Sequence, residues 1–555
     1  MRQAFLRHGW LLFACIAALT LASTIAIEAL NFSPVPISDM WDGYITFGTR
    51  LSLGDTSAWF AQHNEHRIIL ARLLFWLDMH LFNGSTHFLI LCNFLLAFLA
   101  AGTFAAVTRA GLPGGESASL RRCIYAAIAI LCFSWVQHEN FNWGFQSQFF
   151  AAQSLPLLAL FLLWRSQQSQ VLFPLACLVG IASAGTMANG VLALPCLLLL
   201  AIVLRLGMVR IVTLALLTAL TLFAYFHGYH SISGHGSLSA ELNSQPANLL
   251  RYVLLYLGSP VFHLGGGPQL AKYAGLLICL SSLGFALLAA KEWRQRPLTL
   301  CLVIYLGYLG ATALGTAGGR LNFGLEQALS SRYTTPALMA WCALLVLFAQ
   351  RWQGLLRRSA LAQLTVLLFL LIFLPAQWHA FRAGSTEPQA KMLAALSLEM
   401  EVQDNDVIQH IYPSYKKVAA LSEDARRLNK SIFANDAIRD IEQSIGHPMD
   451  AHGTGTCLGS IDRLVEINGT PEYRRIDGWL FSPDAGRSPR KIWIVDAQGL
   501  VAGYALAGWP RPDVAKLIDR RGMDSGFTGY LKASASSGPL RLLGESPNCT
   551  FQPQN

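Results

Sequence analysis

The chain has 555 residues, of which 53% are hydrophobic and only 13% are charged, about half the charged fraction of a soluble globular protein. This composition excludes an ordinary soluble protein and predicts a surface that is largely covered by lipid. The net charge of +9 does not indicate a nucleic-acid binder, because the basic residues occur in short clusters between apolar runs and form no stripe with aromatic residues.

The first two thirds of the chain carry long apolar runs. Arg2 and Arg7 precede the first run. We interpret this run as a retained signal anchor rather than a cleaved signal peptide, because it is longer than the apolar region of a usual signal peptide and no clear A-x-A cleavage site follows. The runs predict about eleven transmembrane helices. They lie near residues 10–30, 86–107, 123–136, 149–164, 171–183, 190–204, 211–226, 268–290, 298–314, 334–350 and 360–376. Residues 248–262 are either a helix on the membrane surface or a further span.

Lys and Arg gather in every second connection between these spans, as the positive-inside rule requires of cytoplasmic loops. The residues are Arg109, Arg121, Arg122, Arg165, Arg205, Arg210, Lys291, Arg294, Arg296, Arg351, Arg357 and Arg358. This alternation predicts a cytoplasmic N-terminus. It places the remaining connections and the segment after Trp378 outside, which in a bacterial inner membrane is the periplasm.

The sequence therefore divides into a transmembrane domain (residues 1–378), a helical periplasmic connector (379–456) and a β-rich periplasmic domain (457–555). Short apolar runs between Gly, Pro and Asp predict a small β-sandwich in the last part, so the region after the spans is an α+β domain. Cys457 and Cys549 flank the predicted sandwich. A disulfide between them would stabilise it by about 4–5 kcal/mol in the loop-entropy model.

The first outside connection contains Asp39 and Asp42, three residues apart and close to aromatic residues. A helical turn would place both carboxylates in one pocket. One could then accept a proton from a hydroxyl, while the other orients that hydroxyl or holds a divalent cation. The structural alternative is that Asp39 caps a surface helix.

Further along the same connection, six consecutive side chains from Gln62 to Arg67 can all form hydrogen bonds. Glu65, His66 and Arg67 suit a sugar or a phosphate headgroup, and they open onto a predicted amphipathic helix along the membrane surface at 67–82. His63 and His66 are candidate metal ligands together with Glu65. A solvated helix start would carry similar residues.

The next outside connection, 137–148, alternates amides with aromatic rings. Aromatic faces stack on sugars and amides bond their hydroxyls, so His138, Glu139 and Gln146 are candidate sugar-binding residues. An interfacial aromatic belt is the alternative.

Two arginines depart from the positive-inside pattern. Arg320 and Arg332 lie in an outside connection, where Tyr333 follows directly, and a forked guanidinium at the lipid interface suits a phosphate. Pairing with Glu326 is the structural alternative. The clear spans carry no central charged residue and show no inverted repeat, and the sequence has no P-loop, so energy-coupled transport is disfavoured.

Residues 1–378 resemble the GT-C class of integral membrane glycosyltransferases. The matching features are the many spans, Asp39 and Asp42 in the first outside connection before a surface helix, and a soluble domain after the last span. The resemblance implies transfer of a sugar from a polyprenyl-phosphate donor to a cell-envelope glycan or lipid. Asp39 or Asp42 would be the general base of an inverting transfer, and Arg320 or Arg332 would neutralise the leaving phosphate.

Two other functions remain open. An O-antigen-type polymerase or ligase would depend on the arginines more than on the aspartates. A non-enzymatic membrane protein that moves or holds polysaccharide would depend on neither.

Overall fold

The computed structural model describes residues 8–230, 234, 236–449 and 455–553, so Arg2 and Arg7 lie outside the described residues. The chain forms two compact units. The first, the helical unit, comprises Met1–Leu30, Trp59–Leu74 and Leu89–Ala383. The second, the mixed unit, comprises Asn31–Ala58, Phe75–Phe88 and Gly384–Asn555.

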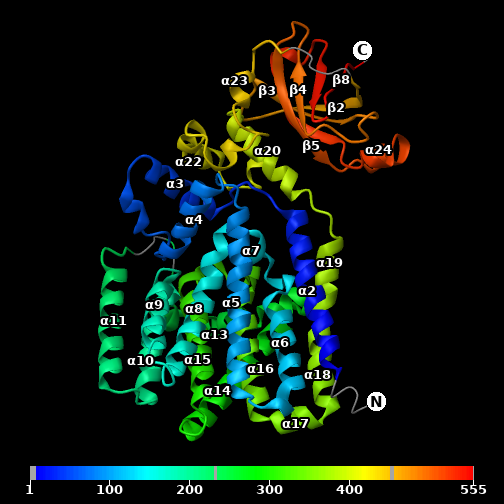
Figure 1. Ribbon diagram of the computed structural model, residues 1–555. Coiled ribbons are helices and arrows are strands. Elements are labelled where there is room, and N and C mark those ends of the chain that lie inside the picture. Colours follow the sequence, from blue (N-terminus) through cyan, green and yellow to red (C-terminus); the bar gives the residue numbers. More distant parts are fainter. Residues whose placement is uncertain (1–7, 231–233, 235, 450–454, 554–555) are drawn as a thin grey trace. The chain divides into compact units, whose positions relative to one another are not determined.

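The helical unit is a bundle of mostly apolar helices (Figure 1). Its helices are α2 (Trp10–Asn31), α5 (His87–Gly111), α6 (Ala118–Cys132), α7 (His138–Asn142), α8 (Ser147–Arg165), α9 (Leu172–Ala184), α10 (Ala193–Val203), α11 (Met208–Phe226), α12 (Leu238–Ser244), α13 (Pro246–Val261), α14 (Gly267–Glu292), α15 (Pro297–Arg320), α16 (Thr334–Arg351), α17 (Gln353–Arg358), α18 (Ala360–Leu371) and α19 (Phe373–Arg382).

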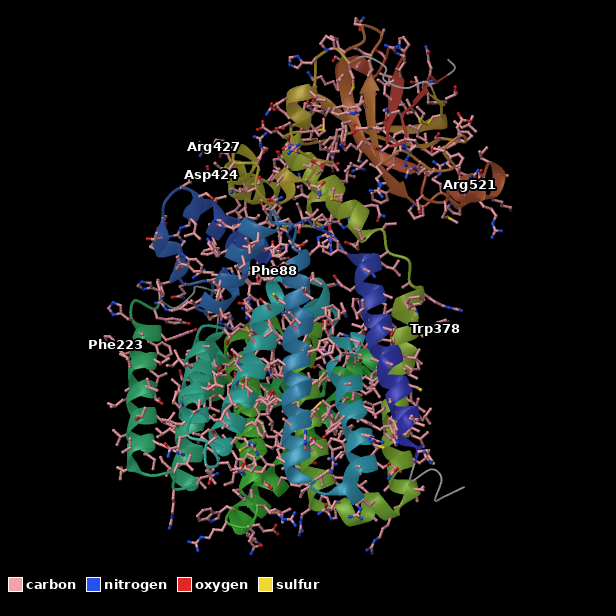
Figure 2. The ribbon with its side chains drawn as sticks, in the orientation of Figure 1. Phe88, Phe223, Trp378, Asp424, Arg427 and Arg521 are labelled. Carbon is pink, nitrogen blue, oxygen red and sulfur yellow. A yellow bond between two sulfur atoms is a disulfide. The ribbon has the colours of Figure 1, made fainter. Side chains whose placement is uncertain are left out.

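Nine helical segments of the described chain are long and apolar enough to cross a membrane, so the protein is a multi-pass membrane protein. Exposed apolar side chains such as Phe223 and Trp378, which Figure 2 labels, give the bundle a lipid-compatible surface. The expected count of about eleven differs because two predicted spans are α9, with 13 residues, and α10, with 11. At 1.5 Å per residue such helices reach at most about 20 Å, which is short of the ~30 Å hydrocarbon core.

Residues 248–262 do not form a separate surface helix. They belong to α13, which packs antiparallel against α14, with Gly258 on the main chain of Ala271 and Gly275 on that of Leu254. Gly265 has φ of 89° in the turn between the two helices, a backbone conformation that glycine adopts without strain. The interior face of α13 carries buried tyrosines, including Tyr252 and Tyr256, and thereby brings hydroxyl groups into the bundle.

The basic connections meet at one end of this bundle, which we call the basic end. Arg210 approaches the Ser166 hydroxyl at 3.3 Å, and Arg205 lies over the Trp293 ring. The Arg296 guanidinium lies 3.5 Å from the Gln350 carbonyl oxygen. The predicted clusters of positive charge are therefore grouped in space.

The mixed unit combines segments from both ends of the chain. Its helical part includes the π-turn η1 (Trp41–Ile45), α3 (Thr46–Ser52), the second half of α4 (Ile69–Leu81), α20 (Glu387–Glu399), α21 (Asn405–Ile408), α22 (Tyr415–Arg427) and α23 (Ile441–Ser444). The helix predicted at 67–82 is thus α4, but Arg72 and Asp78 on it are buried. Because both charged side chains are buried, the polar side of α4 also packs against protein.

The rest of the mixed unit is one eight-stranded sheet instead of the predicted two-layer sandwich. The strands are β1 (Gly455–Thr456), β2 (Leu458–Glu466), β3 (Tyr473–Phe481), β4 (Lys491–Val495), β5 (Val501–Trp509), β6 (Gly526–Lys532), β7 (Arg541–Glu545) and β8 (Cys549–Phe551), and α24 (Pro512–Leu517) follows β5. Their order is β1-β8-β7-β4-β5-β6-β3-β2. Only Cys457 separates the two terminal strands β1 and β2, so the sheet curls round on itself (Figure 1). The closure involves the short strand β1, which pairs with β8, while β2 pairs along its length with β3.

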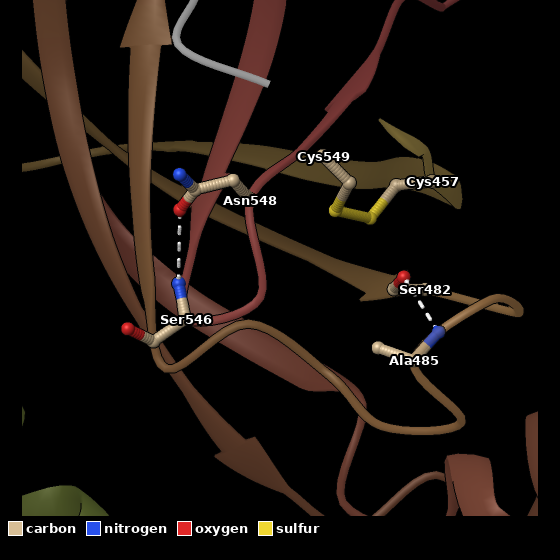
Figure 3. The surroundings of a disulfide bond; sticks show 6 residues. All are labelled: Cys457, Ser482, Ala485, Ser546, Asn548 and Cys549. Atoms are coloured by element: carbon tan, nitrogen blue, oxygen red, sulfur yellow. Dashed lines mark hydrogen bonds between the residues drawn. A yellow bond between two sulfur atoms is a disulfide. The ribbon is translucent and has the colours of Figure 1, made fainter. Parts of the chain in front are cut away.

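The inner face of this sheet forms a hydrophobic core that includes Ile476, Ile492, Phe527 and Leu542. Cys457 and Cys549 are buried in the same core and form a disulfide that encloses a sequence separation of 92 residues (Figure 3). The bridge lies where the sheet closes and joins the β2 segment covalently to β8.

Candidate functional site

The carboxylates of the first outside connection lie on a short irregular helix in the mixed unit. Ser38 has φ of 46° and its backbone N–H donates to the Ile411 carbonyl oxygen at 2.8 Å, which fixes the point where the chain turns into the helix. The helix passes through the π-turn η1, whose Trp41 and Tyr44 are fully buried. Such π-turns often occur at functional sites, and this one leaves Asp39 and Asp42 partly exposed.

The two carboxylates have different surroundings. Tyr412 donates its hydroxyl to Asp42 Oδ2 at 2.9 Å, and the Lys417 ammonium nitrogen lies 3.4 Å from Asp42 Oδ1. The Asp39 carboxylate has no hydrogen-bond or ion-pair partner among the residues that the structure describes. Asp42 is therefore held in place by a cation and a hydroxyl, while Asp39 is available to an incoming group.

Tyr412 and Lys417 were not candidates in the sequence. They come from the connector after the last span, and Tyr412 lies 370 residues after Asp42. The surrounding run, Tyr412 to Lys417, is an ordinary polar segment. No periodicity or motif could have paired it with the first outside connection.

A third carboxylate, Asp78, is fully buried beside this segment. Tyr44 donates to Asp78 Oδ2 at 2.7 Å, and the Thr86 N–H donates to the same oxygen at 3.3 Å. Burial raises the pKa of Asp78 to about 6, although both hydrogen bonds act in the opposite direction. Asp78 thus joins α4 to the turn that carries Asp42, in a position where its charge is costly.

In the helical unit, Glu65 and His66 form a separate cluster with Arg320. The Arg320 guanidinium contacts Glu65 Oε2 at 3.2 Å, and His66 Nε2 lies 4.0 Å from the same oxygen. His66 Nδ1 accepts the Ala188 N–H at 3.1 Å. Desolvation lowers the pKa of His66 to about 4, so at neutral pH the ring is neutral and its proton is on Nε2, toward Glu65.

The other members of the 62–67 run shape the loop. His63 and His66 exchange two backbone hydrogen bonds of 2.9 Å around Asn64, which has φ of 46°. The three donor nitrogens of Arg67 are occupied by main-chain carbonyl oxygens, at 2.6–2.7 Å, of Phe60, Tyr225 and His227. Arg67 therefore ties this loop to the end of α11 in the present conformation.

His138 and Glu139 meet the segment before α16. Ser330 donates to the Glu139 carboxylate at 3.2 Å, and His138 Nδ1 lies 3.1 Å from the Ser331 hydroxyl. The ring of His263 is 6.1 Å from that of His138. When the histidines are neutral, this cluster of two histidines, two serines and one carboxylate carries the single negative charge of Glu139.

Other amides and rings of the predicted sugar-binding segment are buried. Phe141 is 0% and Phe145 2% exposed, and Gln146 is 1% exposed with an Oε1 atom that lacks a hydrogen-bond partner. Asn140 donates to the Arg332 carbonyl oxygen and to Thr335. These contacts favour a packing role for most of this segment over an open sugar-binding wall.

Arg332 and Tyr333 lie beside the buried tyrosines of α13. The Arg332 guanidinium lies over the Tyr333 ring at 5.4 Å, and that ring packs on Tyr256 at 4.9 Å. Because α15 ends at Arg320 and α16 begins at Thr334, both arginines lie at the end of the bundle opposite the basic end.

The predicted site residues are thus divided between the two units. Asp39 and Asp42 belong to the mixed unit, whereas the candidate substrate-binding residues belong to the helical unit. The latter are Glu65, His66, Arg67, His138, Glu139, Gln146, Arg320, Arg332 and Tyr333. Within the described residues, no three His, Cys, Asp or Glu side chains are grouped closely enough to hold a metal ion, so His63 and His66 lack a third ligand there.

Comparison with known proteins gives one structural similarity. No family model matches the chain, and no curated protein matches its sequence. A solved structure of the Archaeoglobus fulgidus oligosaccharyltransferase, in complex with Zn and sulfate, aligns with 72% of this chain at a TM-score of 0.42 and 13% identity. The aligned region spans 57% of that protein. The chain is therefore similar, over part of its length, to an archaeal oligosaccharyltransferase.

Proposed function

We propose that this protein is a membrane glycosyltransferase of the GT-C type, which transfers a sugar from a polyprenyl-phosphate donor to a glycan or lipid acceptor. The observation that carries the proposal is the contrast between Asp39 and Asp42 on one short helix. Asp42 is engaged by Lys417 and Tyr412, and Asp39 has no partner in the described chain. Two carboxylates in different environments are suited to different roles in one reaction.

In this proposal Asp39 is the general base. The acceptor hydroxyl attacks the anomeric carbon of the donor sugar, and its proton passes to the Asp39 carboxylate. The bond between that carbon and the phosphate oxygen breaks, and polyprenyl phosphate leaves with the electron pair. Asp42, whose carboxylate is held by Lys417 3.4 Å away and by the Tyr412 hydroxyl, positions the acceptor.

The arginines at the end of the bundle opposite the basic end serve the leaving phosphate. Arg320 bonds one Glu65 oxygen through one of its nitrogens, so its other N–H groups can donate to phosphate oxygens. His66 is neutral at physiological pH and adds an N–H donor without adding charge. A lipid-linked donor would present its phosphate at this depth, because its polyprenyl chain remains among the helices. By the positive-inside rule this end faces the periplasm of a bacterial inner membrane.

The test is transfer of radiolabelled sugar from polyprenyl-phosphate donors by the purified full-length protein in lipid. We expect Asp39→Asn to lower the rate about 10²–10⁴-fold, as loss of a general base does, and Asp42→Asn to have a smaller effect. Asp55→Asn is the matched control, because Asp55 is an exposed carboxylate of the same connection that pairs with Arg50. It should retain the wild-type rate.

Full activity in both Asp39→Asn and Asp42→Asn would refute the proposed roles of these carboxylates. If the wild type transfers no sugar from any donor, the polymerase or ligase and the non-enzymatic alternatives take precedence. Loss of polymer formation in Arg320→Gln, with no effect of the aspartate variants, would identify the polymerase or ligase.

A further inference from the structure

The basic end of the helical unit contains a cleft far along the bundle from the groups discussed above. It lies between α14, the start of α15 and the end of α16, and the space there, including the open solvent at its mouth, is about 310 Å³. One wall is apolar and the other is polar. The lining residues are Phe285, Leu288, Ala289, Glu292, Arg296, Thr299, Leu347, Gln350 and Arg351.

The polar wall carries a net positive charge. Glu292 lies between two guanidinium groups, with its Oε2 3.4 Å from Arg296 Nε and its Oε1 3.6 Å from Arg351 Nη2. One carboxylate balances only one of the two cations, and each guanidinium has five N–H groups. The arginine side chains are 41% and 38% exposed, so several of their donors face the cleft or its mouth.

Gln350 contributes its main chain to the same wall. Its backbone oxygen lies 3.5 Å from Arg296 and helps to hold that guanidinium at the cleft. The side-chain nitrogen of Gln350 lies against Gly111 of α5, which is not a lining residue of the cleft.

The surroundings of the cleft indicate which kind of molecule it binds. Leu283 and Leu287 on α14 are 57% and 60% exposed, so this side of the helix faces lipid. Trp352, which directly follows α16, packs against Phe285 and Phe348 at ring distances of 5.9 and 4.6 Å. Tryptophan at a helix end is typical of the membrane–water interface, so the cleft opens at the depth of lipid headgroups.

We propose that this cleft binds one anionic phospholipid. Its phosphodiester accepts hydrogen bonds from Arg296 and Arg351, and an acyl chain runs along Phe285 and Leu288. The excess of one positive charge matches the single negative charge of a phosphatidylglycerol headgroup, and basic pockets between helices on the cytoplasmic side commonly hold such lipids. The site is independent of the proposed glycosyl transfer.

The test is lipid binding to the full-length protein in detergent, measured by native mass spectrometry with phosphatidylglycerol and phosphatidylcholine of identical acyl chains. Arg296→Gln/Arg351→Gln should weaken phosphatidylglycerol binding by about tenfold or more. Lys291→Gln/Arg294→Gln is the matched control. It removes two exposed charges at the same end without touching the cleft lining, and it should change the affinity less than twofold.

A second variant tests the cleft independently, in case the loss of both arginines impairs folding. Leu288→Trp keeps both arginines and fills the cleft, and it should lower phosphatidylglycerol binding without changing the net charge. Equal losses in the cleft and control variants would overturn the proposal, because they would show diffuse attraction. Equal binding of the two lipids would also overturn it. So would displacement of phosphatidylglycerol by millimolar inorganic phosphate, since the site would then take a free anion.

Discussion

Asp78→Asn should remove part of the pH dependence of the stability of the mixed unit. The Asp78 carboxyl group is fully buried, and its hydrogen bonds come from the Tyr44 hydroxyl and the Thr86 N–H. Burial raises its pKa from 3.8 to about 6. The folded protein therefore binds this proton more tightly than the unfolded chain does.

The size of the effect follows from the difference between the two pKa values. A shift of about two units corresponds to about 3 kcal/mol. Because the folded-state pKa is raised, this contribution to stability is fully present below pH 3.8 and is lost as the pH rises through about 6. Asparagine binds no proton in this range, so the variant lacks this loss.

Thermal unfolding of the full-length protein in detergent between pH 4 and pH 7, followed by tryptophan fluorescence, measures the difference. The melting temperature of the wild type should fall more steeply with rising pH than that of Asp78→Asn. Asp436→Asn is the control, because the Asp436 side chain is 83% exposed and should leave the slope unchanged. Identical slopes in Asp78→Asn and the wild type would refute the reasoning.

Two further substitutions test other parts of the fold. Burial raises the pKa of Glu399 from 4.5 to about 7 despite the nearby Arg426, so Glu399→Gln should flatten the pH dependence of unfolding between those values; an unchanged melting profile would contradict this. Gly258→Leu should destabilise the helical unit by more than about 2 kcal/mol, because its Cβ would fall on the Ala271 carbonyl oxygen. Gly284→Leu, at an open helical position, is the control in the same detergent melting assay, and equal melting temperatures would disprove the close packing of α13 on α14.

Hydropathy predicted the long helices well because a run of some twenty apolar residues has few alternatives to crossing a bilayer. It placed α5 and α11 within four residues of their observed bounds, whereas α15 extends six residues beyond its predicted end. It could not distinguish α9 and α10 from full spans, since a short apolar helix that packs among other helices has the same composition as a helix that crosses the membrane. The position of α13 depends on glycines that permit close approach, which hydropathy does not register.

In the sheet of the mixed unit, turns can be predicted from neighbouring residues, but pairing between strands that are distant in sequence cannot. Asp496 and Gly499, residue types that favour turns, form the turn between β4 and β5, where the Gly499 N–H donates to the Asp496 carbonyl oxygen. The strand β3 is hard to identify from apolar runs because Tyr473–Phe481 contains three charged residues, Arg474, Arg475 and Asp477. The pairing of β1 with β8 joins residues that are far apart in sequence. A local sequence pattern therefore cannot predict this pairing.

At the candidate site, the sequence predicted the residues but not their surroundings. The position of Asp39 and Asp42 in the first outside connection made both of them candidates, but the sequence could not assign them different roles. The structure distinguishes them through Lys417 and Tyr412, which lie in a segment without a motif. Likewise, Arg67 and Arg320 are equally basic in sequence, yet one is occupied by main-chain carbonyls and the other by Glu65.

The contact between Asp42 and Tyr412 also has a consequence for biosynthesis. The two residues are 370 positions apart, so at 5–20 residues per second the ribosome needs about 20–70 s to make the second after the first. During that interval Trp41, which packs near Phe433 in the finished unit, has no native partner from the connector. The first connection therefore reaches its native packing only after the connector has been synthesised.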